Sequence, residues 1–274
     1  MNSTSSLLAT GLPLRDKKQV ARSFSRAADT YDAVADFQRR VGQQLFELLP
    51  HEQVKTVLDL GCGTGFFYSQ LVQKYSEASV IGLDLAEGML KHCANHHQGK
   101  WLCADAETIP LADNSIDIIY SSLAIQWCEN TEALFAEVFR VLKPEGRFIF
   151  STLGPNSLHE LREAWSAVDD YVHVNRFIEN TALKTAMDQA GFCGDSNLVL
   201  SEEIITLEYQ TLRELTWELK GIGAHNVNSG RPAGLTGRKR MQTFINGYEQ
   251  QRNDNGMLPA SYQVWFGQLH KPSA

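Results

Sequence analysis

Short apolar runs alternate with amphipathic stretches along the middle of this chain of 274 residues. Apolar runs bounded by turn residues indicate buried strands, whereas apolar positions that repeat every three or four residues indicate helices. The two patterns alternate between Thr56 and Thr152, with helices expected after Gly65, Ala86 and Thr131. Such alternation predicts a right-handed, doubly wound parallel sheet. Its expected strands are 57–60, 79–84, 100–103, 116–120 and 148–152.

Periodic segments also flank this alternating part. Further helices are expected at 16–28, 31–49, 158–168 and 180–190, and further strands at 198–208 and 260–269. The expected organisation is a mobile Ser/Thr-rich tail (1–14), N-terminal cap helices (15–50), a core (51–208), a glycine-rich and helical cap insertion (209–258) and a final strand that completes the core (259–274).

The first strand runs into a turn with three alternating glycines, Gly61, Gly63 and Gly65. Glycine lets the backbone turn sharply and lets a ligand approach it closely. The dinucleotide fingerprint G-x-G-x-x-G would need another glycine where this chain has Phe66, and the strand itself contains an acid, Asp59. The spacing instead resembles the first motif of class I S-adenosylmethionine-dependent methyltransferases. That resemblance implies that the glycine turn lies under the methionine part of the cofactor.

The ends of the next strands carry residues that suit an adenosine. Asp84 ends the second strand, where a carboxylate can accept both ribose hydroxyls. Asp105, followed by Ala106, comes after the third strand and could meet the adenine amino group, and the fourth strand leads into Leu123. A lone acid of this kind is usually a helix cap or a turn former. The repeated placement at strand ends favours a cofactor site, and the expected cofactor is S-adenosylmethionine.

Composition sets further bounds. The chain is 43% hydrophobic and 21% charged, as is usual for a soluble globular protein. No apolar run approaches the roughly 18 residues of a membrane span, and the first residues lack a secretory start, so a cytoplasmic protein is expected. Five cysteines without a C-x-x-C pair predict neither a disulfide framework nor a metal site. A net charge of −7 argues against nucleic acid as a partner.

Two segments are locally basic, although the chain as a whole is negatively charged. Residues 219–240 are rich in glycine and hold five basic residues and no acid, and residues 15–40 hold seven basic residues against four acids. Charge runs are most often solvated faces. Here we favour a surface that handles anions, because long glycine-rich loops inside a domain tend to be functional and both segments should fold over the cofactor end of the sheet.

Three signatures resemble the malonyl-acyl-carrier-protein O-methyltransferase family of biotin synthesis. They are VARSFSRAA at 20–28 with the following Tyr31-Asp32 and Gln38-Arg39, the LKGIGAHN run at 219–226 with the GR and GLTGR after it, and LPASY at 258–262. The resemblance covers nearly the whole chain beyond residue 15. It implies an α/β, Rossmann-like class I methyltransferase fold: a seven-stranded, mostly parallel sheet with helices on both faces and a helical and loop cap.

The resemblance also implies the substrate, a malonyl thioester on acyl carrier protein or on coenzyme A, whose free carboxylate becomes a methyl ester. A carboxyl pKa near ~4 leaves this group ionised at pH 7, so no general base is needed. Arginine can bind a carboxylate through two hydrogen bonds, so Arg231 or Arg238 is expected at the acceptor. Tyr31 is expected to begin the second helix. Its hydroxyl could donate a hydrogen bond to the acceptor carboxylate, or its ring could close the site around the methionine end of the cofactor. A tyrosine that only packs in the core is the alternative. Gln38, two helical turns further along, is a weaker cofactor candidate.

Two other interpretations stay open. One is a methyltransferase for a different small acceptor, such as a quinone precursor or a dicarboxylic acid. The other is a non-catalytic protein that binds the cofactor or associates with RNA; binding to RNA should weaken steeply with salt.

Overall fold

A computed structural model of the chain describes residues 16–192, 198–224 and 237–273. The tail expected at 1–14 and Arg231 lie outside these residues. The elements in chain order are α1 (Lys17–Tyr31), α2 (Asp36–Glu47), β1 (Thr56–Leu60), α3 (Phe66–Lys74), β2 (Ser79–Asp84), α4 (Glu87–His96), β3 (Lys100–Cys103), β4 (Ile116–Ser122), the 3₁₀ helix η1 (Ile125–Trp127), α5 (Thr131–Val141), β5 (Leu142–Leu153), α6 (His159–Ser166), α7 (Asn180–Ala190), β6 (Leu198–Tyr209), α8 (Leu212–Gly221), α9 (Arg238–Glu249) and β7 (Leu258–His270).

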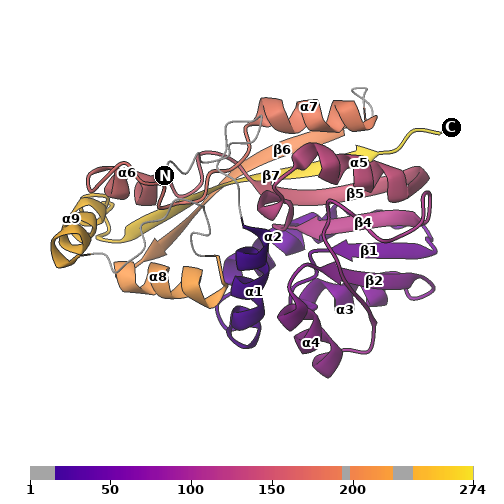
Figure 1. Cartoon of the computed structure of the whole chain (residues 1–274), viewed down its shortest axis with the longest axis horizontal. Helices are drawn as coiled ribbons and strands as arrows, with labels where there is room; N and C mark the ends of the chain where they lie inside the picture. Colours follow the sequence, from indigo (N-terminus) through magenta and orange to yellow (C-terminus); the bar gives the residue numbers. More distant parts are fainter. Residues whose placement is uncertain (1–15, 193–197, 225–236, 274) are drawn as a thin grey trace, which may run out of the picture.

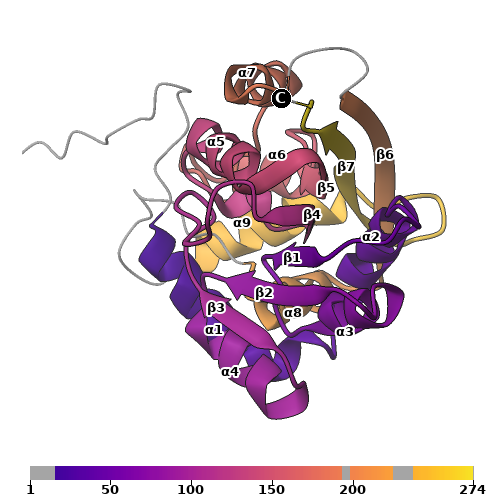
Figure 2. The same ribbon diagram turned by 90° about the vertical axis from the view of Figure 1, so that its right-hand side faces the viewer.

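The strands form one seven-stranded sheet in the order β3-β2-β1-β4-β5-β7-β6 (Figures 1 and 2). The first five strands run parallel, whereas β7 is antiparallel to both β5 and β6. The expected α/β fold with a mostly parallel sheet is confirmed. The chain order along the sheet reverses next to β1, and ligands bind at the carboxyl ends of strands where such a reversal occurs.

Helices cover both faces of the sheet because side chains along each strand point alternately to opposite sides. On β1, Val57 packs with α2 and α3, while the next residue, Leu58, packs with α5 and α7. The same alternation recurs on β4 at Ile118 and Ile119. The side chains buried on both faces are mainly apolar and closely packed, so the sheet is a rigid platform for the residues at its edge.

The cap is built on strands that continue out of the core. β6 and β7 pair over their whole length, and α6, α8 and α9 gather around the end that extends away from the parallel strands (Figure 1). Helix α9 packs against α6, and α8 packs against β6. Helix α1 lies between the two regions, packed on α4 and touching α8.

Three expected boundaries are wrong. The helix expected at 31–49 begins at Asp36, because α1 continues to Tyr31 and the chain then turns. Asp32 fixes this turn by accepting a hydrogen bond of 2.8 Å from the Thr64 hydroxyl in the glycine turn. The fifth strand, expected at 148–152, begins at Leu142, and the glycine-rich loop expected from residue 219 includes the end of α8, which stops at Gly221.

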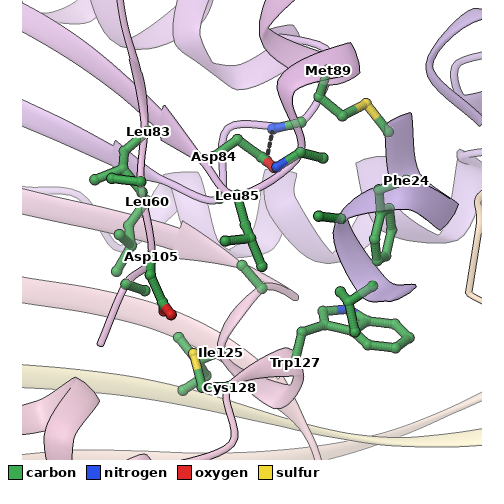
Figure 3. A pocket seen from close by; sticks show the side chains of 18 of the residues that line it. Phe24, Leu60, Leu83, Asp84, Leu85, Met89, Asp105, Ile125, Trp127 and Cys128 are labelled. Atoms are coloured by element: carbon green, nitrogen blue, oxygen red, sulfur yellow. Dashed lines mark hydrogen bonds between the residues drawn. The ribbon is translucent and has the colours of Figure 1, made fainter. Parts of the chain in front are cut away.

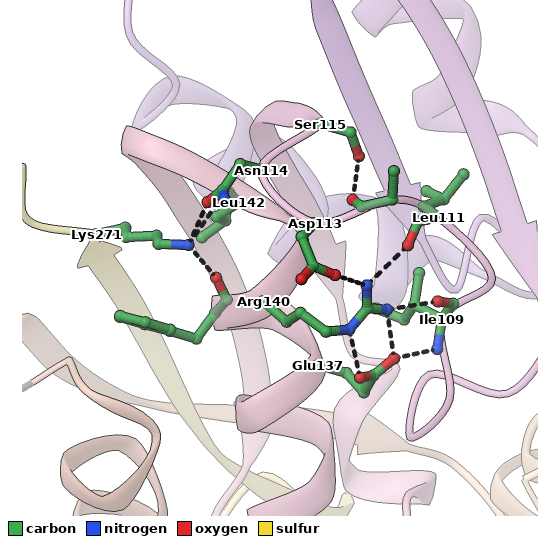
Figure 4. A network of polar contacts seen from close by, with 11 residues as sticks. Ile109, Leu111, Asp113, Asn114, Ser115, Glu137, Arg140, Leu142 and Lys271 are labelled. Atoms are coloured by element: carbon green, nitrogen blue, oxygen red, sulfur yellow. Dashed lines mark hydrogen bonds and ion pairs between the residues drawn. The ribbon is translucent and has the colours of Figure 1, made fainter. Parts of the chain in front are cut away.

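The loop between β3 and β4 is held by a polar network around Arg140 of α5 (Figure 4). Its guanidinium donates to the carbonyl oxygens of Ile109 (2.7 Å) and Leu111 (2.8 Å) and pairs with Asp113 and Glu137. Glu137 in turn accepts from the Ile109 backbone N–H at 2.7 Å. This network fixes the loop that begins at the end of β3. Among the helices in the described part of the chain, none has both the length and the apolar composition that crossing a membrane requires.

Candidate active site

A pocket lies at the carboxyl ends of β1, β2, β3 and β4, beneath helix α1 (Figure 3). The glycine turn forms its floor: Gly61 and Gly63 have φ angles of 79° and 54°, a region that favours glycine. A Cβ on Gly61 would also lie 2.3 Å from the Cβ of Ala124, so no larger residue fits there. Phe24 of α1 and Trp127 of η1 close the other side of the pocket. Their ring centroids are 5.1 Å apart, and the rings pack edge to face.

Asp84 holds the turn in place and faces the pocket. Its two carboxylate oxygens accept from the backbone N–H groups of Gly63 (2.9 Å) and Ala86 (2.8 Å). Burial raises the pKa of Asp84, although the backbone hydrogen bonds oppose that shift. Each carboxylate oxygen can accept more than one hydrogen bond. Asp84 can therefore keep the turn ordered and still accept from ligand hydroxyls.

A second, smaller pocket continues from the first past Asp59 and Gln38. Asp59 is only 2% exposed, and burial, followed by the nearby charge of Asp84, raises its pKa to about 8. Asp59 Oδ2 and Gln38 Oε1 are buried and accept no hydrogen bond from any described residue. Two buried acceptors without a donor are costly. A cationic ligand group such as an ammonium would satisfy them.

At the end of the first pocket that lies away from Asp59, the side chain of Lys17 pairs with two acids, a contact that the sequence did not predict. Lys17 of α1 donates to Asp105 Oδ2 at 2.6 Å and lies 2.7 Å from Glu107 Oε2. Burial lowers the pKa of Lys17, but the hydrogen bonds to these two acids outweigh it and raise the pKa overall. Asp105 thus lies at the pocket, with Ala106 beside it, and both of its carboxylate oxygens already accept a hydrogen bond, Oδ2 from Lys17 and Oδ1 from the Glu107 backbone N–H at 3.0 Å.

Tyr31 and Leu123 lie where the pockets meet a third and larger one. Tyr31 lines all three, and Leu123 lines the first and the third. Leu123 has a φ of 50°, an uncommon conformation for a branched residue, and its carbonyl oxygen accepts from Gln126 Nε2 at 2.6 Å. Tyr31 is the last residue of α1, not the first of a second helix, so Tyr31 and Gln38 approach the site from different helices.

The third pocket is a cavity of about 460 Å³ between the core and the cap. Its wall is mostly apolar, and its few polar side chains include Tyr31, Gln38, Asn175 and Lys220. Asn175 Oδ1 is buried and, within the described residues, has no hydrogen-bond partner. The cavity suits an acyl group with a few polar atoms.

Of the two arginines expected at the acceptor, only Arg238 is within the described residues. It is exposed at the first position of α9 and is not among the residues that line the three pockets. The described chain also holds no group of three or more His, Cys, Asp or Glu side chains arranged to bind a metal.

Lys17, Phe24 and Asn175 are site residues that the sequence reasoning missed. The signal for the first two is the spacing of Lys17, Val20, Ala21 and Phe24, which places them on one face of α1. No comparable signal marks Asn175, because it lies in a segment without regular structure whose position is set by tertiary packing.

Comparison with known proteins agrees with this geometry. A family model described as a methyltransferase domain matches residues 58–150. The YcgJ protein from Bacillus subtilis has the same fold, with a TM-score of 0.57 at 19% identity, covering 85% of this chain and 98% of that one. The fold, the glycine turn and the strand-end pocket therefore define a class I methyltransferase.

Closer relatives narrow the class to a family. The malonyl-[acyl-carrier protein] O-methyltransferase of Gallionella capsiferriformans is 42% identical over 272 residues, which cover 94% of this chain and 92% of the relative. The biotin biosynthesis bifunctional protein BioHC of Cellvibrio japonicus is 50% identical over 260 residues, and this chain spans about half of that longer protein, 51% of its length. The chain belongs to the malonyl-[acyl-carrier protein] O-methyltransferase family.

Proposed function

We propose that this chain transfers a methyl group from S-adenosylmethionine to the free carboxylate of a malonyl thioester, carried by acyl carrier protein or by coenzyme A. The product, a methyl ester, would start the pimeloyl chain of biotin. The observation that carries the proposal is the junction at Tyr31, where a pocket with buried acceptors meets an apolar cavity. Family membership supports the choice of acceptor.

The pocket residues suit S-adenosylmethionine, which when bound supplies an electrophilic methyl group on a sulfonium. We assign the ribose hydroxyls to Asp84 and the methionine ammonium to Asp59 and Gln38, whose oxygens lack donors. Gly61 and Gly63 let the ligand lie close to the backbone.

The adenine end is assigned to Asp105, Ala106 and Leu123. All three line the strand-end pocket. Because Lys17 already pairs with Asp105 Oδ2, an adenine amino group would share Asp105 Oδ1 with the Glu107 backbone N–H, or would displace Lys17. Trp127 and Phe24 offer aromatic surface on the facing side.

Methylation of a carboxylate requires that the protein position the acceptor and exclude water, and it does not require a general base. Burial raises the pKa of Tyr31, so its hydroxyl stays protonated and can donate a hydrogen bond to a carboxylate. The apolar cavity wall keeps water from competing with the acyl group. Holding a carboxylate oxygen in line with the methyl group lowers the barrier by proximity. Arg231 and Arg238 remain our candidates for the carboxylate, and Arg231→Ala is the sharper test, since Arg238 does not line the cavity.

The test is transfer of labelled methyl to malonyl-acyl carrier protein, to malonyl-coenzyme A and to a malonyl thioester whose carboxylate is capped as an ethyl ester. We expect label on both free acids and none on the capped compound. If neither acid is labelled while the cofactor still binds, the acceptor is a different small molecule, and quinone precursors and free dicarboxylic acids are the next to try.

A further inference from the structure

The outer face of helix α8 carries a row of exposed side chains that do not contribute to the core. Arg213, Trp217 and Lys220 follow one another at intervals of four and three residues, so they share one side of the helix. Trp217 is 63% exposed, the most exposed of the large hydrophobic side chains in the described part of the chain. An exposed tryptophan between two cations is typical of a binding surface, because tryptophan and arginine dominate the energy of many interfaces.

Helix α1 extends this row. Arg22 and Arg26 are exposed on its outer side, one turn apart. The two helices are joined by two hydrogen bonds, from the Ser23 hydroxyl to the carbonyl oxygen of Gly223 (2.8 Å) and from the Thr30 hydroxyl to that of Gly221 (3.0 Å). We call the set Arg22, Arg26, Arg213, Trp217 and Lys220 the α1–α8 face.

The charges of the four cationic side chains on this face are not paired with acids of the described chain. The neighbouring acid Glu214 accepts from the Gln210 backbone N–H at 2.9 Å, and Asp29 lies 3.6 Å from His92. In a chain with a net charge of −7, this positive surface runs against the average. It would attract an acidic partner.

The face borders the third pocket, the cavity between core and cap, which we call the acceptor cavity because we assign the acyl group to it. Lys220 belongs to both, and Thr216, one position before Trp217, also lines the cavity. From α1, Phe24 and Tyr31 line the same cavity on the side opposite to Arg22 and Arg26. A partner bound to the face would therefore have the cavity within reach of a flexible arm.

We propose that the α1–α8 face docks an acidic acyl carrier protein, with Trp217 as the apolar anchor and the arginines steering the approach. This inference rests on the proposed function and adds the surface on which the carrier protein would bind. A carrier protein presents the malonyl thioester on a long phosphopantetheine arm. Coenzyme A carries the same arm without the protein, so it can enter the cavity but cannot use the face.

The experiment compares malonyl-acyl carrier protein with malonyl-coenzyme A for the unmodified protein and the variants Trp217→Ala, Arg26→Glu and Arg213→Glu. Each variant should lower kcat/KM for the carrier protein by about tenfold or more, mostly through KM, and change kcat/KM for malonyl-coenzyme A by less than about twofold. Lys184→Glu is the matched control, since Lys184 is an exposed lysine of α7, which covers the other face of the sheet (Figure 1). It should leave both substrates unchanged.

Salt gives a second readout. For the unmodified protein, kcat/KM with the carrier protein should fall as ionic strength rises, and Arg26→Glu and Arg213→Glu should flatten this dependence. Equal losses with both substrates, or a loss in Lys184→Glu as large as in the other charge reversals, would overturn docking at this face. If the unmodified protein methylates malonyl-coenzyme A but not the carrier protein, docking is wrong and the proposed reaction stands. If it methylates neither, the proposed function itself is wrong.

Discussion

Asp59 is the buried acid whose charge state is most open to test. Its pKa is raised to about 8, so the folded chain keeps a proton there that the unfolded chain releases above pH ~4. Its contribution to stability is therefore complete below pH ~4 and is lost as the pH rises toward 8. We expect Asp59→Asn to be more stable than the unmodified protein at pH 8, with the difference growing by up to about 1.4 kcal/mol per pH unit between pH 5 and pH 8.

Urea unfolding of both proteins at several pH values measures this difference. Saturating S-adenosylhomocysteine, which carries the same ammonium as the cofactor, should reduce it, because an ammonium paired with Asp59 favours the ionised carboxylate. A difference that does not change with pH would show that Asp59 is already ionised in the folded chain.

Asp84 has a separate part in binding. Asp84→Ala removes the acceptor that we propose for the ribose hydroxyls and leaves the N–H groups of Gly63 and Ala86 without the carboxylate that binds them. Hydrogen bonds to a charged group contribute about 1.5–3 kcal/mol, so cofactor affinity should fall about 10- to 100-fold by calorimetry. Asp254→Ala, an exposed acid in the turn before β7, is the control and should bind normally. Arg231→Ala should also bind the cofactor normally and lose malonyl turnover; an equal loss of binding would contradict this division of roles.

The residues at strand ends could be predicted because the fold determines their positions. Once alternating strands and helices are recognised, Gly61, Gly63, Asp84 and Asp105 must lie at one edge of the sheet, and they do. Asn175 could not be predicted with a role in the site, because it gains that role from packing between segments far apart in sequence. For Lys17, the spacing along α1 indicates which side of the helix it lies on, but not its pairing with the distant Asp105.

Helix α1 covers the cofactor pocket and is held there by polar contacts at both ends. Asp16 begins it by accepting from the backbone N–H groups of Lys18 (2.9 Å) and Gln19 (3.2 Å). Beyond this cap, Lys17 ties α1 to Asp105 and Glu107. At the other end, Asp32, the residue after the helix, binds Thr64. Between these two ends the helix presents the apolar side chains of Val20, Ala21 and Phe24 to the pocket.

Removing the Lys17 contact should loosen this cover. We expect Lys17→Met to raise the dissociation rate of the cofactor product several-fold, by about 1 kcal/mol, while the association rate changes little. Stopped-flow displacement measures the rate. Lys18→Met, which alters the exposed neighbour, is the control. Slower dissociation in Lys17→Met would mean that Lys17 competes with the cofactor for Asp105 rather than closing the pocket over it.

The sequence predicts the ends of helices and strands most accurately where the repeat of apolar residues is strong. Helix α7 and strands β2 and β3 begin and end where the sequence predicted. The break between α1 and α2 is predicted at residues 29–30, but it lies at residues 32–35. What ends α1 is a tertiary contact, the Asp32–Thr64 hydrogen bond, together with the burial of Val34 and Ala35 in the turn.

Two strands, β6 and β7, are part of the core sheet and also extend into the cap, so they connect the two regions. β6 and β7 pair through twelve registered positions, from Leu198 with Leu269 to Tyr209 with Leu258, and β7 also pairs with β5 in the core. The division into a core at 51–208, an insertion at 209–258 and a final strand at 259–274 is a division along the sequence. In space the cap rests on strands that the core sheet contains (Figure 1).

A cap built on core strands should not unfold alone. Loss of the cap would expose the extended halves of β6 and β7 and the apolar cavity wall, and those strands are hydrogen-bonded into the sheet. We therefore expect one cooperative transition in urea, with coincident curves from far-ultraviolet circular dichroism and from the fluorescence of two single-tryptophan variants, one retaining Trp217 in the cap and one retaining Trp101 in the core. S-adenosylhomocysteine should shift both fluorescence curves equally, because binding stabilises the folded chain as a unit. A Trp217 transition at lower urea than the Trp101 transition would show that the cap is an independent unit, and the acceptor cavity would then open without unfolding of the cofactor pocket.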